Sequence, residues 1–172
     1  IIGITMSFQV FIVWLHLLGA MIWVGGLVFL VLVVGPALKR ATSVREHLRL
    51  GLNVEGRFRA VMWPAVGVVL LTGLFNVINL LYATSLSGGS LPPMFTRMLA
   101  LKIGLVVVMV ILQAVDQLVV RSKRIEGLKN LAPEATALSA PLLTWQRLSQ
   151  WLGLVIMVLA IAVVWLGVTL AR

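Results

Sequence analysis

Four long apolar stretches divide the chain, and the segments between them hold most of its charged residues. The stretches cover about residues 8–38, 61–83, 98–120 and 151–171. Each reaches the length of roughly 20 apolar residues that a helix needs to cross the hydrocarbon core of a bilayer. The pattern therefore predicts an all-α integral membrane protein, in which residues 1–172 form a single domain built as a bundle of four transmembrane helices.

Composition supports this prediction. Hydrophobic residues make up 61% of the chain and charged residues only 11%, whereas a soluble domain averages about 25% charged residues. The first partner to expect is the lipid bilayer. The chain has no cysteine, which excludes disulfides, thiolate metal sites, iron–sulfur clusters and covalent c-type haem attachment.

The positive charges are distributed unevenly among the loops. The net charge is +9, and the loop between the second and third stretches holds only Arg97. Because positive residues favour the cytoplasmic side, we expect the first and third loops inside and both termini on the outer, periplasmic side. This membrane orientation accounts for the positive net charge, so binding to nucleic acid is not needed to explain it. The residues concerned are Lys39, Arg40, Arg45, Arg49, Arg57 and Arg59 in the first loop, and Arg121, Lys123, Arg124, Lys129 and Arg147 in the third.

His16 lies in the middle of an apolar run, residues 11–23, within the first stretch. A histidine in hydrocarbon is costly and usually faces the bundle interior, water or a ligand. With helix one running inward, His16 lies roughly 12 Å below the outer end, at 1.5 Å per residue. Haem ligation, copper ligation, proton transfer and a plain interhelical hydrogen bond all remain open for it.

Several polar residues fall at a similar depth. Thr72, Asn76 and Asn79 follow i, i+4, i+7 spacing and form one polar stripe on the second helix. Lys102 lies about one turn below the outer boundary of the third helix. His16, Asn76, Asn79 and Lys102 are therefore expected to converge on one site. The alternatives are interhelical bonding for the asparagines and snorkelling to the headgroups for Lys102.

Small residues flank the histidine. His16, Gly19, Trp23 and Gly26 share one helix face, at i, i+3, i+7 and i+10. Glycines at these positions leave room either for a flat macrocycle such as haem or for a closely packed helix.

Methionines suggest copper as a second possibility. Met94 and Met98 are spaced i, i+4 at the outer start of the third helix, and Met6 lies at the outer start of the first. Soft Cu(I) favours methionine and histidine ligands, so these residues with His16 are candidates for a copper site. Methionine also serves as ordinary core filler.

The inner end of the third helix carries a second polar cluster, Gln113, Asp116 and Gln117. We expect Asp116 to anchor this end by pairing with an arginine of the basic loops. The candidates are Arg57, Arg59 and Arg121. His47 lies in the basic first loop and is expected to be solvated.

The first loop also contains a helix-start signal, Thr42-Ser43-Val44-Arg45-Glu46, in which a capping residue is followed by an acidic one, and it predicts a short helix there. The Gly35-Pro36 pair is expected to kink or stop the first helix. No nucleotide-binding loop, catalytic triad or metalloprotease motif is present.

Several stretches of the chain together carry a resemblance to a known family: Trp14–Ala20 with Trp23–Gly26, Gly35–Leu38, Arg57–Arg59, Leu71–Leu74, the helix start around Lys102, and Leu148–Arg172. Through them the chain resembles the copper resistance protein D (CopD-like) family. The resemblance implies a helical protein of the bacterial inner membrane linked to copper uptake or handling.

The regions around His16 and Lys102 are also similar to the HemJ-like protoporphyrinogen oxidases. That similarity implies haem b at His16 and a functional role for Lys102. Proteins of this kind often carry a further histidine late in the third helix, where this chain reads Ala114-Val115-Asp116. With one membrane histidine, a single subunit lacks the second ligand of a bis-histidine haem.

Three hypotheses follow. The first is a protein that binds or handles copper or haem b through His16. The second is a haem-dependent porphyrinogen oxidase. The third is a structural subunit of a larger membrane complex, with helical partner subunits or further copies of itself. The incomplete ligand set favours a binding role over an enzymatic one.

Overall fold

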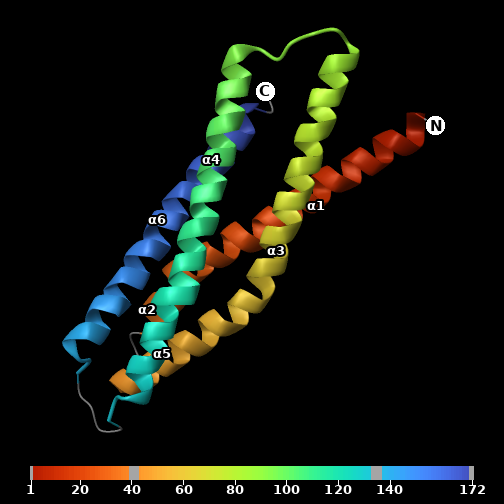
Figure 1. The fold of residues 1–172 in the computed structure, drawn as a ribbon. Helices are drawn as coiled ribbons and strands as arrows, with labels where there is room; N and C mark the ends of the chain where they lie inside the picture. Colours follow the sequence, from red (N-terminus) through yellow and green to blue (C-terminus); the bar gives the residue numbers. More distant parts are fainter. Residues whose placement is uncertain (1, 39–42, 133–136, 171–172) are drawn as a thin grey trace.

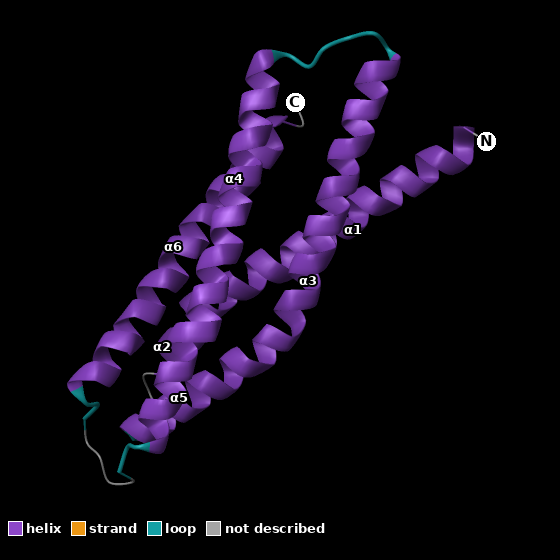
Figure 2. Ribbon diagram, viewed as in Figure 1, coloured by secondary structure: helices purple, strands orange, loops and turns teal. Residues whose placement is uncertain are grey.

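The computed structural model describes residues 2–38, 43–132 and 137–170. These residues form helices without any strand, which confirms the all-α prediction (Figure 2). Four continuous helical rods are long and apolar enough to cross a membrane. The elements are α1 (Ile2–Phe29), the π-helix η1 (Leu30–Val34), α2 (Gly35–Leu38), α3 (Val44–Leu86), α4 (Pro93–Val115), the π-helix η2 (Asp116–Val120), α5 (Arg121–Lys129) and α6 (Ala140–Leu170).

The helices extend well beyond the apolar stretches that predicted them. The second rod begins at Val44 rather than near residue 61, and the third continues through η2 and α5 to Lys129. Ser43 is the N-cap of α3, and its hydroxyl accepts the Glu46 N–H at 3.1 Å. A helix thus starts in the predicted stretch, but it is the long α3 and not a short helix within the loop. Several arginines assigned to loops therefore lie on α3. Hydropathy marks where lipid ends, whereas a helix continues until its backbone is capped.

The rods pack as two antiparallel pairs. α1 packs mainly on α3, and α4 mainly on α6 (Figure 1). The pairs meet through contacts of α1 and η1 with α6 and of α3 with α5. We call the end of the bundle with the α2–α3 and α5–α6 connections the basic end. Both described chain ends and the α3–α4 loop lie at the opposite end, which we call the loop end (Figure 1).

Three irregular turns shape the rods. Pro64 lies inside α3, which bends near the middle of its length (Figure 1), because proline cannot donate to the carbonyl four residues earlier. In η1 the Gly35 N–H donates to the Leu30 carbonyl, five residues back. This wider turn accommodates Pro36, so the helix continues instead of stopping at the Gly-Pro pair. The third turn is η2, where the Arg121 N–H donates to the Asp116 carbonyl.

The tightly packed core is small and lies midway along the bundle. Most large apolar side chains face outward, as expected where lipid is the solvent. The core cluster consists of Trp23, Leu27, Met62, Ala65, Val66, Val69, Met109, Ile156 and Ala160.

Candidate functional site

His16 is hydrogen-bonded across the α1–α3 contact to Thr72. The distance between His16 Nδ1 and Thr72 Oγ1 is 2.9 Å, and the Thr72 hydroxyl donates to the Val68 carbonyl at 2.5 Å. Since that bond uses the only hydroxyl hydrogen, Thr72 accepts from His16, and Nδ1 carries the ring hydrogen. The lone pair of the neutral ring therefore lies on Nε2, the nitrogen left for a ligand.

Glycines bring α1 and α3 together at this point. A Cβ at Gly73 would lie 3.2 Å from His16 Cε1, and one at Gly19 would lie 3.0 Å from a Val69 methyl. A Cβ at Gly26 would overlap the Phe58 ring. The space beside Gly19 and Gly26 is filled by α3 and not by a flat cavity. Of the two readings of these glycines, close helix packing is the one that the structure shows.

The other predicted residues lie around His16 in different ways. Lys102 is half-buried on α4, interacts electrostatically with His16, and points its Nζ at α6, 3.2 Å from where a Gly167 Cβ would be. Asn76 lies one turn beyond Thr72 on α3, and its Oδ1 is enclosed and has no hydrogen-bond partner among the described residues. Asn79 is half-buried on the same helix. Thr72 and Lys102 are thus the predicted polar residues that interact with His16.

The methionines lie towards the loop end. Met94, on the first turn of α4, is 67% exposed, and Met98 is half-buried one turn later. The side chain of Met6 lies outside the described residues. In the described part of the chain, no three histidine, aspartate or glutamate side chains gather in a way that could hold a metal ion. A metal at His16 would thus need ligands of another kind.

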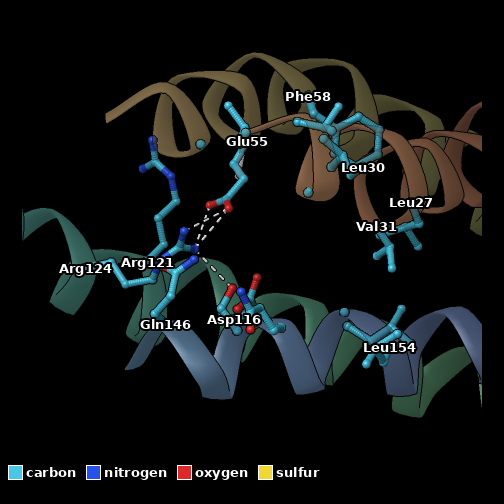
Figure 3. A pocket seen from close by; sticks show the side chains of 18 of the residues that line it. Leu27, Leu30, Val31, Glu55, Phe58, Asp116, Arg121, Arg124, Gln146 and Leu154 are labelled. Carbon is cyan, nitrogen blue, oxygen red and sulfur yellow. Dashed lines mark hydrogen bonds and ion pairs between the residues drawn. The ribbon is translucent and has the colours of Figure 1, made fainter. Parts of the chain in front are cut away.

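A second polar region lies at the basic end, around a cavity of about 370 Å³ (Figure 3). Both π-helices line it, and π-helical turns occur frequently at functional sites. We call it the basic-end cavity. Its polar lining consists of His47, Glu55, Gln113, Asp116, Gln117, Arg121, Arg124, Gln146, Ser149 and Gln150.

A buried ion pair dominates its polar wall. Arg124, only 2% exposed, donates to both oxygens of Glu55 on α3 at 2.9–3.0 Å and to the Ser149 hydroxyl on α6 at 3.1 Å (Figure 3). Asp116, on η2, lines the cavity beside these residues. The hydrogen bonds of Arg124 tie α3, α5 and α6 together at one level.

Two predictions for this region need correction. Among the described residues, Asp116 forms no ion pair with an arginine, and Arg57 and Arg59 are exposed on α3. The anchoring pair is Arg124 with Glu55 instead. His47 is not a solvated loop residue, because it is half-buried in the first turn of α3, and its Nδ1 donates to the Leu38 carbonyl at 2.6 Å.

Glu55 and Ser149 were not singled out by the sequence. Glu55 is one of only five acidic residues in the chain, and it lies six residues before the start of the second apolar stretch. That scarcity was the available signal. The predicted cluster residue Gln117 is bound to α3, accepting from Trp63 Nε1 at 2.8 Å and donating to the Met62 sulfur at 3.6 Å.

The family model of copper resistance protein D matches residues 52–166, more than half of the chain. The chain belongs to the copper resistance protein D family. It is thus a copper-related multi-pass membrane protein. No curated protein and no solved structure gives a match. The matched range includes Thr72, Lys102 and most of the polar wall of the basic-end cavity, whereas His16 precedes it.

Proposed function

We propose that this protein binds copper within the membrane and that Nε2 of His16 is a ligand. The observation that carries the proposal is the hydrogen bond from His16 Nδ1 to Thr72, because it leaves Nε2 as the ring nitrogen with a lone pair. A second partner that fixes the orientation and tautomer of a ligating histidine is a regular feature of metal sites. Membership of the copper resistance protein D family supports copper as the metal.

The remaining ligands follow from the chemistry of copper. Imidazole and thioether groups suit Cu(I), and the chain has no thiolate to offer. Met94 and Met98 are the thioethers that we propose as partners of His16. A neutral histidine and neutral thioethers also suit the hydrocarbon region better than carboxylate ligands, which carry a large desolvation cost.

The positive charge of Lys102 affects how tightly the site would hold copper. Its ammonium group interacts electrostatically with His16, so a copper ion bound at Nε2 would be repelled by it. An ion that must pass through a membrane protein needs a site that is favourable enough to enter and weak enough to leave. We therefore propose that Lys102 keeps the copper exchangeable and that the protein hands copper on rather than storing it.

The test is a Cu(I) titration of the purified protein in lipid nanodiscs against a chromophoric chelator. The wild type should bind one copper ion per chain, and His16→Ala should lose it. His47→Ala is the matched control, because His47 is the other histidine of the chain and lines the basic-end cavity. A Soret absorption band that is present in the wild type and lost in His16→Ala would show that His16 binds haem b instead of copper, and would overturn the proposal. Equal copper binding in His16→Ala and His47→Ala would also overturn it.

A further inference from the structure

The basic-end cavity has a polar end and an apolar end. In Figure 3 the side chains of Glu55, Asp116, Arg121, Arg124 and Gln146 gather at one end, and apolar side chains line the other. The apolar lining includes Leu27, which also belongs to the core in the middle of the bundle. The polar end lies beside α5, at the basic end. The cavity thus runs from the membrane boundary towards its centre. The apolar lining consists of Leu27, Leu30, Val31, Val34, Phe58, Leu154 and Ile156.

The polar end contains buried groups without partners. Among the described residues, Gln113 Oε1, Asp116 Oδ1 and Gln146 Oε1 lack a donor, and Arg121 Nε and Arg124 Nε lack an acceptor. Gln113 is 5% exposed and Arg124 is 2% exposed. A buried polar group without a partner costs about 1–3 kcal/mol. All five atoms belong to residues that line the cavity, which favours an occupant that both donates and accepts hydrogen bonds.

The polar end carries equal numbers of arginine and carboxylate side chains, but not all of them form ion pairs. Two arginines and two carboxylates line it, and Arg124 with Glu55 forms an ion pair. Within the described residues this leaves one anion, Asp116, and one cation, Arg121, without an ion-pair partner. Arg121 makes one weak bond, from Nη2 to the Leu52 carbonyl at 3.4 Å. The complement of this arrangement is a headgroup with one positive and one negative charge.

We propose that the basic-end cavity binds a phospholipid with a zwitterionic headgroup, in which the ammonium group meets Asp116 and the phosphate meets Arg121. Part of one acyl chain lies against the apolar wall formed by η1 and α6. This places the headgroup at the membrane boundary and the chain towards the centre, as in the surrounding leaflet. The cavity is large enough for a headgroup and the start of one chain, within the roughly 300–1,000 Å³ typical of ligand sites.

Other occupants fit less well. Water would satisfy the polar end and leave the apolar wall without a partner. An anionic lipid would supply a phosphate for Arg121 but bring no cation to Asp116. A quinone offers acceptors only, so it would leave the Asp116 carboxylate and the glutamine oxygens unpaired. The proposal concerns the basic end and does not depend on copper binding at His16.

Native mass spectrometry of the detergent-purified protein tests the proposal. Dioleoylphosphatidylethanolamine, dioleoylphosphatidylglycerol and soluble glycerophosphoethanolamine are titrated separately. We expect one phosphatidylethanolamine per chain, bound at least tenfold more tightly than phosphatidylglycerol. The soluble headgroup should bind at least a hundredfold more weakly, because it lacks the chain.

Two isosteric or near-isosteric variants separate the charges. Asp116→Asn should weaken phosphatidylethanolamine at least fivefold and remove the preference over phosphatidylglycerol, whereas Arg121→Gln should weaken both lipids alike. Val31→Trp should fill the apolar end and weaken both lipids. The matched controls, Glu126→Gln and Arg97→Gln, remove exposed charges away from the cavity and should change nothing. Circular dichroism and gel filtration confirm that each variant is folded. Absence of a bound lipid in the wild type, or a headgroup preference that survives Asp116→Asn, would overturn the proposal.

Discussion

His16 on α1 donates its Nδ1 hydrogen to the Thr72 hydroxyl on α3, and Thr72 passes its own hydrogen to the Val68 carbonyl. A short chain of hydrogen bonds thus fixes the tautomer of the imidazole at a contact between two membrane-spanning helices. The same contact is held close by Gly73, whose missing Cβ lets the ring lie against α3.

The first prediction concerns Thr72. Thr72→Val removes the acceptor of the Nδ1 hydrogen and should lower copper affinity about tenfold or more, the range found when partners of ligating histidines are changed. Thr72→Ser keeps the hydroxyl and should stay within about threefold of the wild type. The measurement is the Cu(I) titration in nanodiscs. Equal loss in both variants would show that packing, and not the hydrogen bond, determines affinity.

A second prediction concerns the charge near His16. Lys102→Met removes a positive charge that repels bound copper and should raise copper affinity about fivefold or more. Lys102→Arg keeps the charge and should leave affinity nearly unchanged. Retention of copper during dialysis provides an independent readout, since slower release should accompany the tighter binding. A fall in affinity in Lys102→Met would mean that the amine assists copper binding.

The neighbouring glycines of α1 provide a matched test of helix packing. Gly26→Ala places a methyl group where the Phe58 ring lies and should cost about 1–3 kcal/mol of stability. Gly25→Ala meets nothing within 4 Å and should be neutral or slightly stabilising. Thermal unfolding in detergent, followed by circular dichroism, compares the two. Equal effects would contradict the close α1–α3 contact.

The ion pair between Arg124 and Glu55 should stabilise the basic end. Arg124→Met leaves the Glu55 carboxylate unpaired. Breaking a fully buried pair costs about 3–5 kcal/mol, and we expect about 2–3 kcal/mol here because the Glu55 side chain is 31% exposed. Lys123→Met breaks an exposed pair with Glu126 and should cost less than about 1 kcal/mol. In the double variant Arg124→Met with Glu55→Met, much of the loss should be recovered. The same unfolding assay reports all three, and no recovery would argue against an unpaired carboxylate as the cause.

The number of membrane-spanning helices was predictable from sequence because lipid imposes a minimum apolar length on each. The contact of His16 with the Thr72 helix was foreseeable in part, since comparing depths placed the polar stripe of the second apolar stretch near it. Whether Gly19 and Gly26 accommodate a macrocycle or a helix was not predictable, because both require the same missing side chains. Only the position of α3 decides it.

The basic-end cavity could not be predicted for two physical reasons. Glu55 and Ser149 lie outside the apolar stretches, in segments that are helical although hydropathy does not mark them. In addition, the π-helical turn at Asp116–Val120 inserts an extra residue into one turn and so shifts the faces presented on either side of it. Regular helical spacing therefore misplaces the side chains on the two sides of this turn relative to one another.

The central claim is that His16 is a copper ligand, and the most direct test is X-ray absorption spectroscopy of the Cu(I)-loaded protein. The account predicts one nitrogen scatterer from imidazole together with sulfur scatterers, and loss of the imidazole signal in His16→Ala but not in His47→Ala. A spectrum that is identical in the wild type and His16→Ala would contradict it.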